Sequence, residues 1–221
     1  MSNARNLSNL LGTGTTIGTA SIADDAIDAD KLDLSANYAF TGTVTGAGTM
    51  EAISTTNITT PASSVTFDNL STDYDIFRCI YELHPSTDNV QMDLQFLDAA
   101  GSAITGGTSY GNYADFDGTA ITADDASTIP LCASNLGNDT HEGLRGSFDL
   151  LGRNYAVATD VVAPCITGIN IGHYNSNVYS GGVVIGGLNS SQIQTIRGFL
   201  IKVSSGNIER GKIYLFGIRN A

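Results

Sequence analysis

The segment Val90-Gln91-Met92-Asp93-Leu94-Gln95-Phe96 alternates strictly between apolar and polar side chains. Because successive side chains of an extended chain point to opposite sides, this alternation predicts a half-buried β-strand. A second run with the same alternation lies just before it, with its apolar side chains at Phe77, Cys79, Tyr81 and Leu83. Residues 84–89, His-Pro-Ser-Thr-Asp-Asn, are rich in turn formers and predict a hairpin loop joining the two strands.

The same pattern continues on both sides of this pair. Short apolar or alternating runs separated by Gly, Asn, Asp and Ser predict further strands at 64–67, 146–151, 163–171, 178–185, 193–203 and 211–218. The polar stretch 98–143 is expected to form extended loops. No segment after Glu51 keeps a helical period over ten residues, so residues 51–221 are predicted to be an all-β head domain, a β-sandwich or jelly roll.

Composition narrows the classes of partner. The chain of 221 residues carries a net charge of −12, with 10 Lys and Arg against 22 Asp and Glu, which disfavours nucleic acid and anionic membranes. No apolar run is long enough to be inserted in a membrane, and residues 1–11 do not read as a secretory signal. Cys79, Cys132 and Cys165 are expected to be reduced and mostly buried, as suits synthesis in a reducing cytoplasm.

The N-terminal part follows a different pattern, with large apolar residues five apart in a Gly/Thr/Ala/Asp-rich stretch. A period of five fits neither a helix nor a strand, and so sparse a row closes a core only if several chains lie side by side. We therefore predict an extended stalk at 13–50 that associates through Ile17, Ile22, Ile27, Leu32, Phe40 and Val44. Residues 1–12 are predicted to be an anchoring arm that docks on another protein through Leu7, Leu10 and Leu11, because one such helical face is too small to fold alone.

Two parts of the sequence resemble bacteriophage tail-fibre and related virion proteins. Residues 22–32, Ile-Ala-Asp-Asp-Ala-Ile-Asp-Ala-Asp-Lys-Leu, followed by 40–46, Phe-Thr-Gly-Thr-Val-Thr-Gly, are similar to their stalk segments. The C-terminal part resembles a β-sandwich at the ends of such proteins, in residues 64–70 leading to Tyr74, in 110–113 and in 211–218. The resemblance implies a homotrimeric structural protein of the virion, exposed on the particle, whose N-terminal arm binds other virion structural proteins and whose head points outward.

Two sequence patterns resemble functional sites, an esterase motif and a calcium-binding run, but neither meets the requirements of its site. Residues 107–111, Gly-Thr-Ser-Tyr-Gly, match the nucleophile elbow of esterases, with His141 and His173 later in the chain, but the elbow needs a strand before it and a helix after it. The acidic residues Asp24, Asp25, Asp28, Asp30 and Asp33 lack the spacing of a calcium loop, although a shared axis of three chains could assemble one. We therefore expect no catalytic residues, no metal and no cofactor.

A binding role is easier to motivate. Tyrosines and asparagines gather among Gly and Ser in predicted loops, where flat rings and amides suit recognition of sugars or proteins. The alternative, and the commoner role for such tyrosines, is packing on the sandwich or across the subunit interface. The candidate receptor contacts are Tyr110, Asn112, Tyr113, Tyr174, Asn175 and Tyr179.

Three functions remain open. The first is a short tail fibre or spike whose head attaches to a host-surface glycan or protein. The second is a capsid or tail decoration protein, such as a head fibre, without receptor binding. The third is a surface-glycan esterase or depolymerase.

Overall fold

A computed structural model of the chain describes residues 50–105, 109–115, 120–123, 127–132, 136–152, 163–174, 178–188 and 194–218. These residues belong to one compact unit, residues 48–221. The predicted anchoring and stalk residues (Leu7, Leu10, Leu11, Ile17, Ile22, Ile27, Leu32, Phe40 and Val44) lie outside the described part, so both predictions stay open.

Within the described residues the chain forms twelve strands and no helix. They are β1 (Met50–Ile58), β2 (Ser64–Phe67), β3 (Ile76–Pro85), β4 (Met92–Leu97), β5 (Ser109–Asp115), β6 (Ala120–Ala123), β7 (Ile129–Pro130), β8 (Gly143–Leu151), β9 (Cys165–Tyr174), β10 (Val178–Leu188), β11 (Gly198–Val203) and β12 (Ile208–Ile218). The first strand starts one residue before the predicted start of the head, at Met50.

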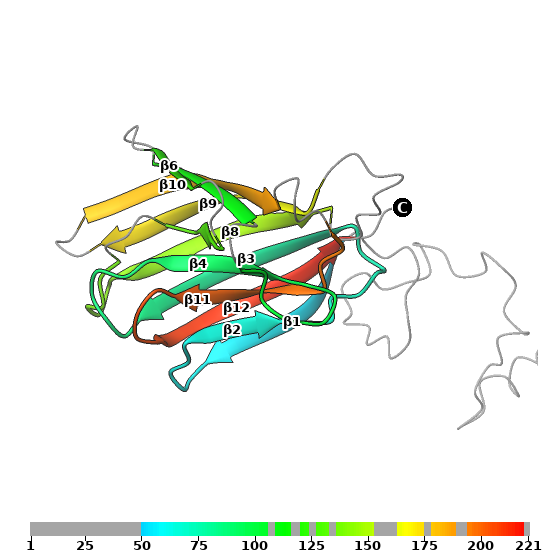
Figure 1. The fold of residues 1–221 in the computed structure, drawn as a ribbon. Coiled ribbons are helices and arrows are strands. Elements are labelled where there is room, and N and C mark those ends of the chain that lie inside the picture. Colours follow the sequence, from blue (N-terminus) through cyan, green and yellow to red (C-terminus); the bar gives the residue numbers. More distant parts are fainter. Residues whose placement is uncertain are drawn as a thin grey trace, which may run out of the picture. The chain divides into compact units, whose positions relative to one another are not determined.

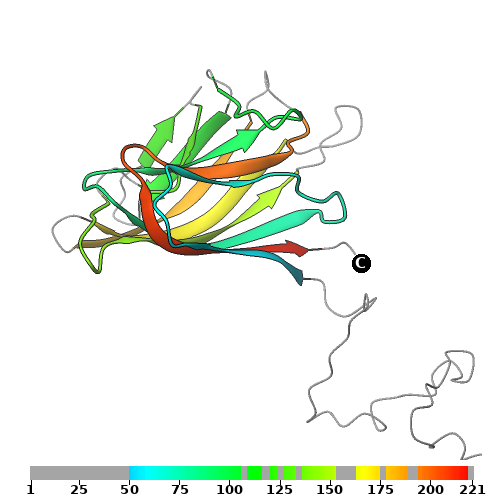
Figure 2. The same ribbon diagram turned by 90° about the horizontal axis from the view of Figure 1, so that it is seen from below.

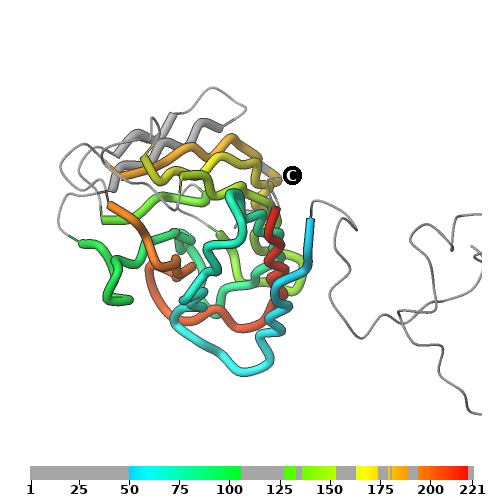
Figure 3. Tube along the Cα trace, turned by 90° about the vertical axis from the view of Figure 1, so that its right-hand side faces the viewer, coloured from blue at the N-terminus to red at the C-terminus, as the bar shows by residue number. Residues whose placement is uncertain are grey.

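The strands form two antiparallel sheets that pack as a sandwich (Figures 1 and 2). The larger sheet has eight strands in the order β1-β12-β3-β8-β9-β10-β5-β6, and the smaller has four in the order β2-β11-β4-β7. Figure 3 shows β1 beside β12 at one edge of the larger sheet. The prediction of an all-β sandwich is confirmed.

Eight of the strands follow the winding of a long hairpin rolled around the sandwich. Its paired arms are β1 with β12, β2 with β11, β3 with β8 and β4 with β7, and successive pairs alternate between the two sheets. This is the winding of a jelly roll, in which two Greek keys share one core. The other four strands are two insertions, β5–β6 between β4 and β7 and β9–β10 between β8 and β11, which extend the larger sheet beyond β8.

The core lies between the sheets and is built from the alternating apolar side chains. Phe199 of the smaller sheet is fully buried and stacks on Phe67, with ring centroids 5.0 Å apart. It also meets the edge of Phe148 from the larger sheet at 5.4 Å. Each such ring buries a large apolar area, so these contacts hold the two sheets together.

Asn170 attaches the inserted β9–β10 pair to the rest of the sandwich. This fully buried amide donates a hydrogen bond from Nδ2 to the carbonyl of Leu131 at 2.7 Å, and its Oδ1 accepts one from the Tyr81 hydroxyl. Its cross-strand neighbour on β8 is Gly146, where a Cβ would collide with the Asn170 side chain. A glycine is therefore required there if the buried amide is to reach its partners.

The predicted hairpin at residues 84–89 is wrong. The strand before it, β3, belongs to the larger sheet, and the strand after it, β4, belongs to the smaller one, so the connection crosses from one sheet to the other. Its start is tied to the turn before β12, since Ser86 donates its N–H to the Asn207 carbonyl at 2.8 Å. Turn-forming residues predict a bend, but they do not specify which strand pairs with which.

The predicted half-buried strand is buried on both faces. In β4 the polar side chains Asp93 and Gln95 are covered as fully as the apolar ones. Gln95 donates from Nε2 to the Ile104 carbonyl at 2.8 Å and accepts from Lys202 Nζ at 3.1 Å. Residues 98–104 fold back over the strand, and this cover follows from tertiary contacts that alternation alone does not reveal.

The stretch 98–143 was predicted as loops but contains three strands. β5 and β6 pair with each other, and β5 also pairs with β10. β7 is a two-residue strand against β4. The polar, Gly-rich composition of this stretch masked the extended backbone, because edge and inserted strands need only one apolar face or none.

Candidate functional site

The outer face of the larger sheet carries a row of polar and aromatic side chains near one end of its strands. On β12 and β3, Arg210 pairs with His84. On β8, β9 and β10, Gly143 pairs with His173, which in turn pairs with Tyr179. Two residues further along the strands, Lys212 pairs with Glu82 and Glu82 with Arg145. Five strands therefore supply the floor of one site.

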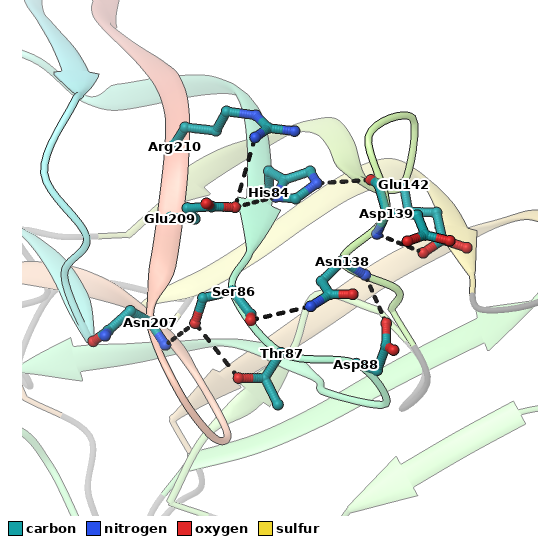
Figure 4. A network of polar contacts seen from close by, with 10 residues as sticks. All are labelled: His84, Ser86, Thr87, Asp88, Asn138, Asp139, Glu142, Asn207, Glu209 and Arg210. Atoms are coloured by element: carbon teal, nitrogen blue, oxygen red, sulfur yellow. Dashed lines mark hydrogen bonds and ion pairs between the residues drawn. The ribbon is translucent and has the colours of Figure 1, made fainter.

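The segment 136–142 folds back over this row and forms a wall (Figure 4). Asp139 and Glu142 close a tight turn, since the Asp139 N–H donates to Glu142 Oε2 at 2.9 Å and the Glu142 N–H to the Asp139 carbonyl at 2.9 Å. Asn138 fixes the turn to the connection after β3, with its N–H on Asp88 Oδ1 at 2.8 Å and its Nδ2 on the Ser86 carbonyl at 3.1 Å. These bonds hold the wall in one place.

Two histidines hold the wall from below. His84 Nε2 lies 2.8 Å from the Asp139 carbonyl, and His173 Nδ1 lies 2.9 Å from the His141 carbonyl. A carbonyl only accepts, so each of these ring nitrogens carries the proton. His84 Nδ1 also lies 3.2 Å from Glu209 Oε2, although the two are not aligned as a hydrogen bond.

The buried His173 ring supports Tyr179. The two rings stack with centroids 4.2 Å apart and an angle of 25° between their planes. Tyr179 is 64% exposed, so one ring face is held in place from below and most of the side chain is open to solvent. An exposed, fixed aromatic ring is the kind of surface that stacks on a ligand.

Between floor and wall lies a cleft of about 490 Å³. This volume falls within the range of small-ligand sites. Its walls combine the end of β3, the turn before β8 and the starts of β8, β10 and β12; the lining residues are Glu82, Leu83, His84, Thr140, His141, Glu142, Gly143, Leu144, Arg145, Tyr179, Arg210, Gly211 and Lys212.

The cleft gathers cations in a protein with a net charge of −12. Arg145 makes one ion pair, from Nη2 to Glu82 Oε1 at 2.6 Å. Arg210 lies 3.6 Å from Glu209, beyond hydrogen-bond distance. Within the described part of the chain, no ion pair is found for Lys212. The cleft therefore offers several N–H donors to a ligand.

Of the six predicted receptor contacts, Tyr179 lines this cleft. Asn175 lies outside the described residues. Tyr174 ends β9, and Tyr110, Asn112 and Tyr113 belong to β5, so these four lie in strands and not in the predicted loops; their side chains are outside the described part. Tyr110 pairs with Gly187, eight residues along β10 from Tyr179, or about 26 Å at the rise of a strand. The structure therefore separates the two predicted tyrosine groups.

Sequence reasoning missed the cations and the two histidines. Arg210 and Lys212 are spaced by two at the start of a strand, which places both on one face, but nothing local indicates that Arg145 and Tyr179 share that face. Only the strand order β12-β3-β8-β9-β10 brings them together.

The esterase pattern does not have the geometry it needs. Ser109 begins β5, so no described strand leads into it, whereas a nucleophile elbow lies where a strand ends and a helix starts. Among the described residues, no group of three or more His, Cys, Asp or Glu side chains is placed to hold a metal ion. Within the same residues, no helix is long and apolar enough to span a membrane. The acidic run at 24–33 lies outside the described part.

The chain has no match among the protein-family models, the curated proteins or the solved structures with which it was compared. The fold and the cleft are therefore the ground for a functional proposal.

Proposed function

We propose that this protein is a structural protein of a bacteriophage virion, a short tail fibre or spike that is attached by its N-terminal arm, trimerises through its stalk and uses the sandwich head for attachment to the host surface. The observation that carries the attachment role is the cleft around Tyr179, with its supported exposed ring and surrounding N–H donors.

This chemistry suits a surface glycan. A sugar ring presents an apolar face that can lie on Tyr179, while its hydroxyls and any acidic groups can accept bonds from Arg145, Arg210 and Lys212. One such site would bind weakly. Several copies on one particle would multiply the affinity, since linked sites can exceed single-site affinity by about 10²–10⁴.

The test is binding of the full-length protein to a panel of immobilised bacterial surface polysaccharides. Tyr179→Ala should weaken binding by about 2- to 13-fold per site, because loss of an aromatic stacking contact costs about 0.5–1.5 kcal/mol, and the factor grows with the number of linked sites. Tyr179→Phe keeps the ring and should bind nearly as the parent protein does. Unfolding midpoints of both variants should match that of the parent, since Tyr179 lies outside the core.

Binding that is unchanged in Tyr179→Ala would remove the cleft as the attachment site. A protein that binds no polysaccharide and no host cell, but whose loss makes virions fragile, would instead be a capsid or tail decoration protein.

A further inference from the structure

Beyond the cleft, the outer face of the larger sheet carries large apolar side chains in solvent. Tyr214 pairs with Ile80, and Ser147 links Ile80 to Ile169 across the next strands. Ile171 follows on the same face of β9, and Ile185 lies on β10. These five apolar side chains, Ile80, Ile169, Ile171, Ile185 and Tyr214, are called the outer patch; they are between 37% and 56% exposed.

Exposure of this kind needs a reason. Single exposed apolar residues are common on any surface, but contiguous apolar patches above a few hundred Å² usually mark an interface. Four of the five residues are isoleucines, whose branched side chains offer no hydrogen bond that would tie them to a polar ligand. The outer patch therefore fits another protein surface better than a sugar or an ion.

The charges around the outer patch indicate which protein. On β3, Arg78 and Glu82 lie on either side of Ile80; on β8, Asp149 and Arg145 lie on either side of Ser147. Arg78 binds Asp149 through two bonds of 2.8 Å, and Arg145 binds Glu82 at 2.6 Å. At each of these two levels along the strands, β3 and β8 therefore carry opposite charges: Arg78 lies opposite Asp149, and Glu82 lies opposite Arg145.

We propose that the outer patch packs against a second copy of this chain in the assembled particle protein. When β8 of one copy lies over β3 of another, an acid meets a base at both charge levels. Between these levels Ile80 lies over Ser147, and Ile169 of β9 lies over Tyr214 of β12. A partner whose charges all have one sign, such as an acidic polymer, would be attracted and repelled by nearly equal numbers of charged side chains on this face. Sheets packed face to face lie about 10 Å apart, which leaves room for these side chains to interdigitate.

The inference rests on the proposal that several copies work together on one particle. Because the same patch is used on both sides, the contact pairs two heads about a two-fold axis and is distinct from the threefold association proposed for the stalk. Glu82 and Arg145 belong to both surfaces, so the two proposals are tested with different substitutions: neither Ile169 nor Ile185 lines the cleft. Failure of one proposal therefore leaves the other standing.

The experiment uses the full chain, with a reporter cysteine at the centre of the face, Ser147→Cys, and a matched one on the exposed outer side of the smaller sheet, Thr66→Cys. Light scattering should give a multiple of the chain mass of 23.0 kDa. In that assembly we expect a maleimide to label position 147 roughly tenfold more slowly than it does in single chains obtained by dilution, while the rate at the exposed position 66 stays the same. Peptide mass spectrometry separates these sites from the native cysteines.

Adding Ile169→Lys and Ile185→Lys to the Ser147→Cys chain should raise labelling at position 147 to its single-chain rate, even if another segment still holds the chains together. Adding Ile53→Lys, a substitution of an exposed isoleucine outside the outer patch, should leave the protection in place. Circular dichroism confirms that each variant is folded. A single-chain mass for the parent protein, or labelling at position 147 that is as fast in the assembly as in single chains, would overturn the proposal.

Discussion

Removal of the Asn170 amide should destabilise the head strongly, although Asn170 lies in an inserted strand outside the jelly-roll winding. In Asn170→Ala the Leu131 carbonyl loses its donor in a buried site, which costs about 1–3 kcal/mol, and the bond from the Tyr81 hydroxyl is lost as well, which costs about 1 kcal/mol. The expected loss in free energy of unfolding is therefore about 2–4 kcal/mol.

Urea unfolding followed by far-UV circular dichroism measures this loss, since the chain has no tryptophan to report by fluorescence. With a urea dependence of about 2 kcal/mol per molar, the midpoint should fall by about 1–2 M. Tyr81→Phe removes one of the two bonds and should lower the midpoint by about 0.5 M.

A double-mutant cycle decides whether the bond between the two side chains is responsible. Once the amide is gone, Tyr81→Phe should cost much less than it costs in the parent, giving a coupling of about 1 kcal/mol between the two positions. Additive effects, within about 0.3–0.5 kcal/mol, would refute the reasoning, because they would mean that each side chain contributes through packing alone.

Two further predictions concern titratable groups in the core. Burial raises the pKa of Asp93 to about 6, an effect larger than the opposing attraction of Lys202, so the folded state holds this proton more tightly than the unfolded chain does. The contribution of Asp93 to stability is therefore greatest below about pH 4 and falls by about 3 kcal/mol as the pH rises through about 6. Asp93→Asn should abolish that fall and be more stable than the parent at pH 7.5. A variant that is less stable than the parent at pH 7.5 would show that the attraction between Asp93 and Lys202 dominates. Burial also raises the pKa values of the Cys79 and Cys132 thiols, that of Cys132 to about 12, and raises the pKa of the half-buried Cys165. At pH 8 we expect an aromatic disulfide reagent to label Cys165 slowly and the other two only after denaturation; rapid labelling of all three in the folded protein would contradict their burial.

Local patterns predicted most of the strands but not their partners. The alternation from Phe77 to Leu83 and the segment 211–218 mark β3 and β12 because these strands have one face in the core and one in water. In strands of this kind, the alternation of apolar and polar residues shows directly which side chains are buried. In β4 the polar residues Asp93 and Gln95 alternate just as regularly, yet both are buried. Gln95, for example, is covered by residues 98–104, and alternation within the strand does not reveal such cover.

The site was less predictable than the fold, for the same reason. Tyr179 is predicted as an aromatic residue in a loop; in the structure it lies at the start of β10 and is exposed in the cleft. Arg145, Arg210 and His173 carry no local signal, because their role depends on strand order across the larger sheet. Tyr110 and Tyr113 look equivalent to Tyr179 in sequence, but their strand pairs with the far end of β10.

The division between the jelly-roll strands and the inserted strands explains how one domain can combine a stable core with an adaptable surface. The aromatic contacts of the core come from Phe67, Phe148 and Phe199, which all lie in the jelly-roll strands. The β9–β10 insertion contributes Tyr179 to the cleft, the buried His173 that stacks on Tyr179, and three of the four isoleucines of the outer patch. Substitutions on its outer side can therefore change the chemistry of the proposed binding surface while its inner side stays docked.

That docking depends heavily on one buried amide. If Asn170 is the fastening between the insertion and the roll, its loss should loosen the cleft at denaturant concentrations that leave the phenylalanine core intact. Hydrogen exchange in Asn170→Ala should then rise in β9 and β10 before it rises in β3 and β12, as expected when one cooperative unit opens ahead of another. Uniform loss of protection across all four strands would instead mean that roll and insertion unfold as a single unit, and that the binding surface cannot vary independently of the core.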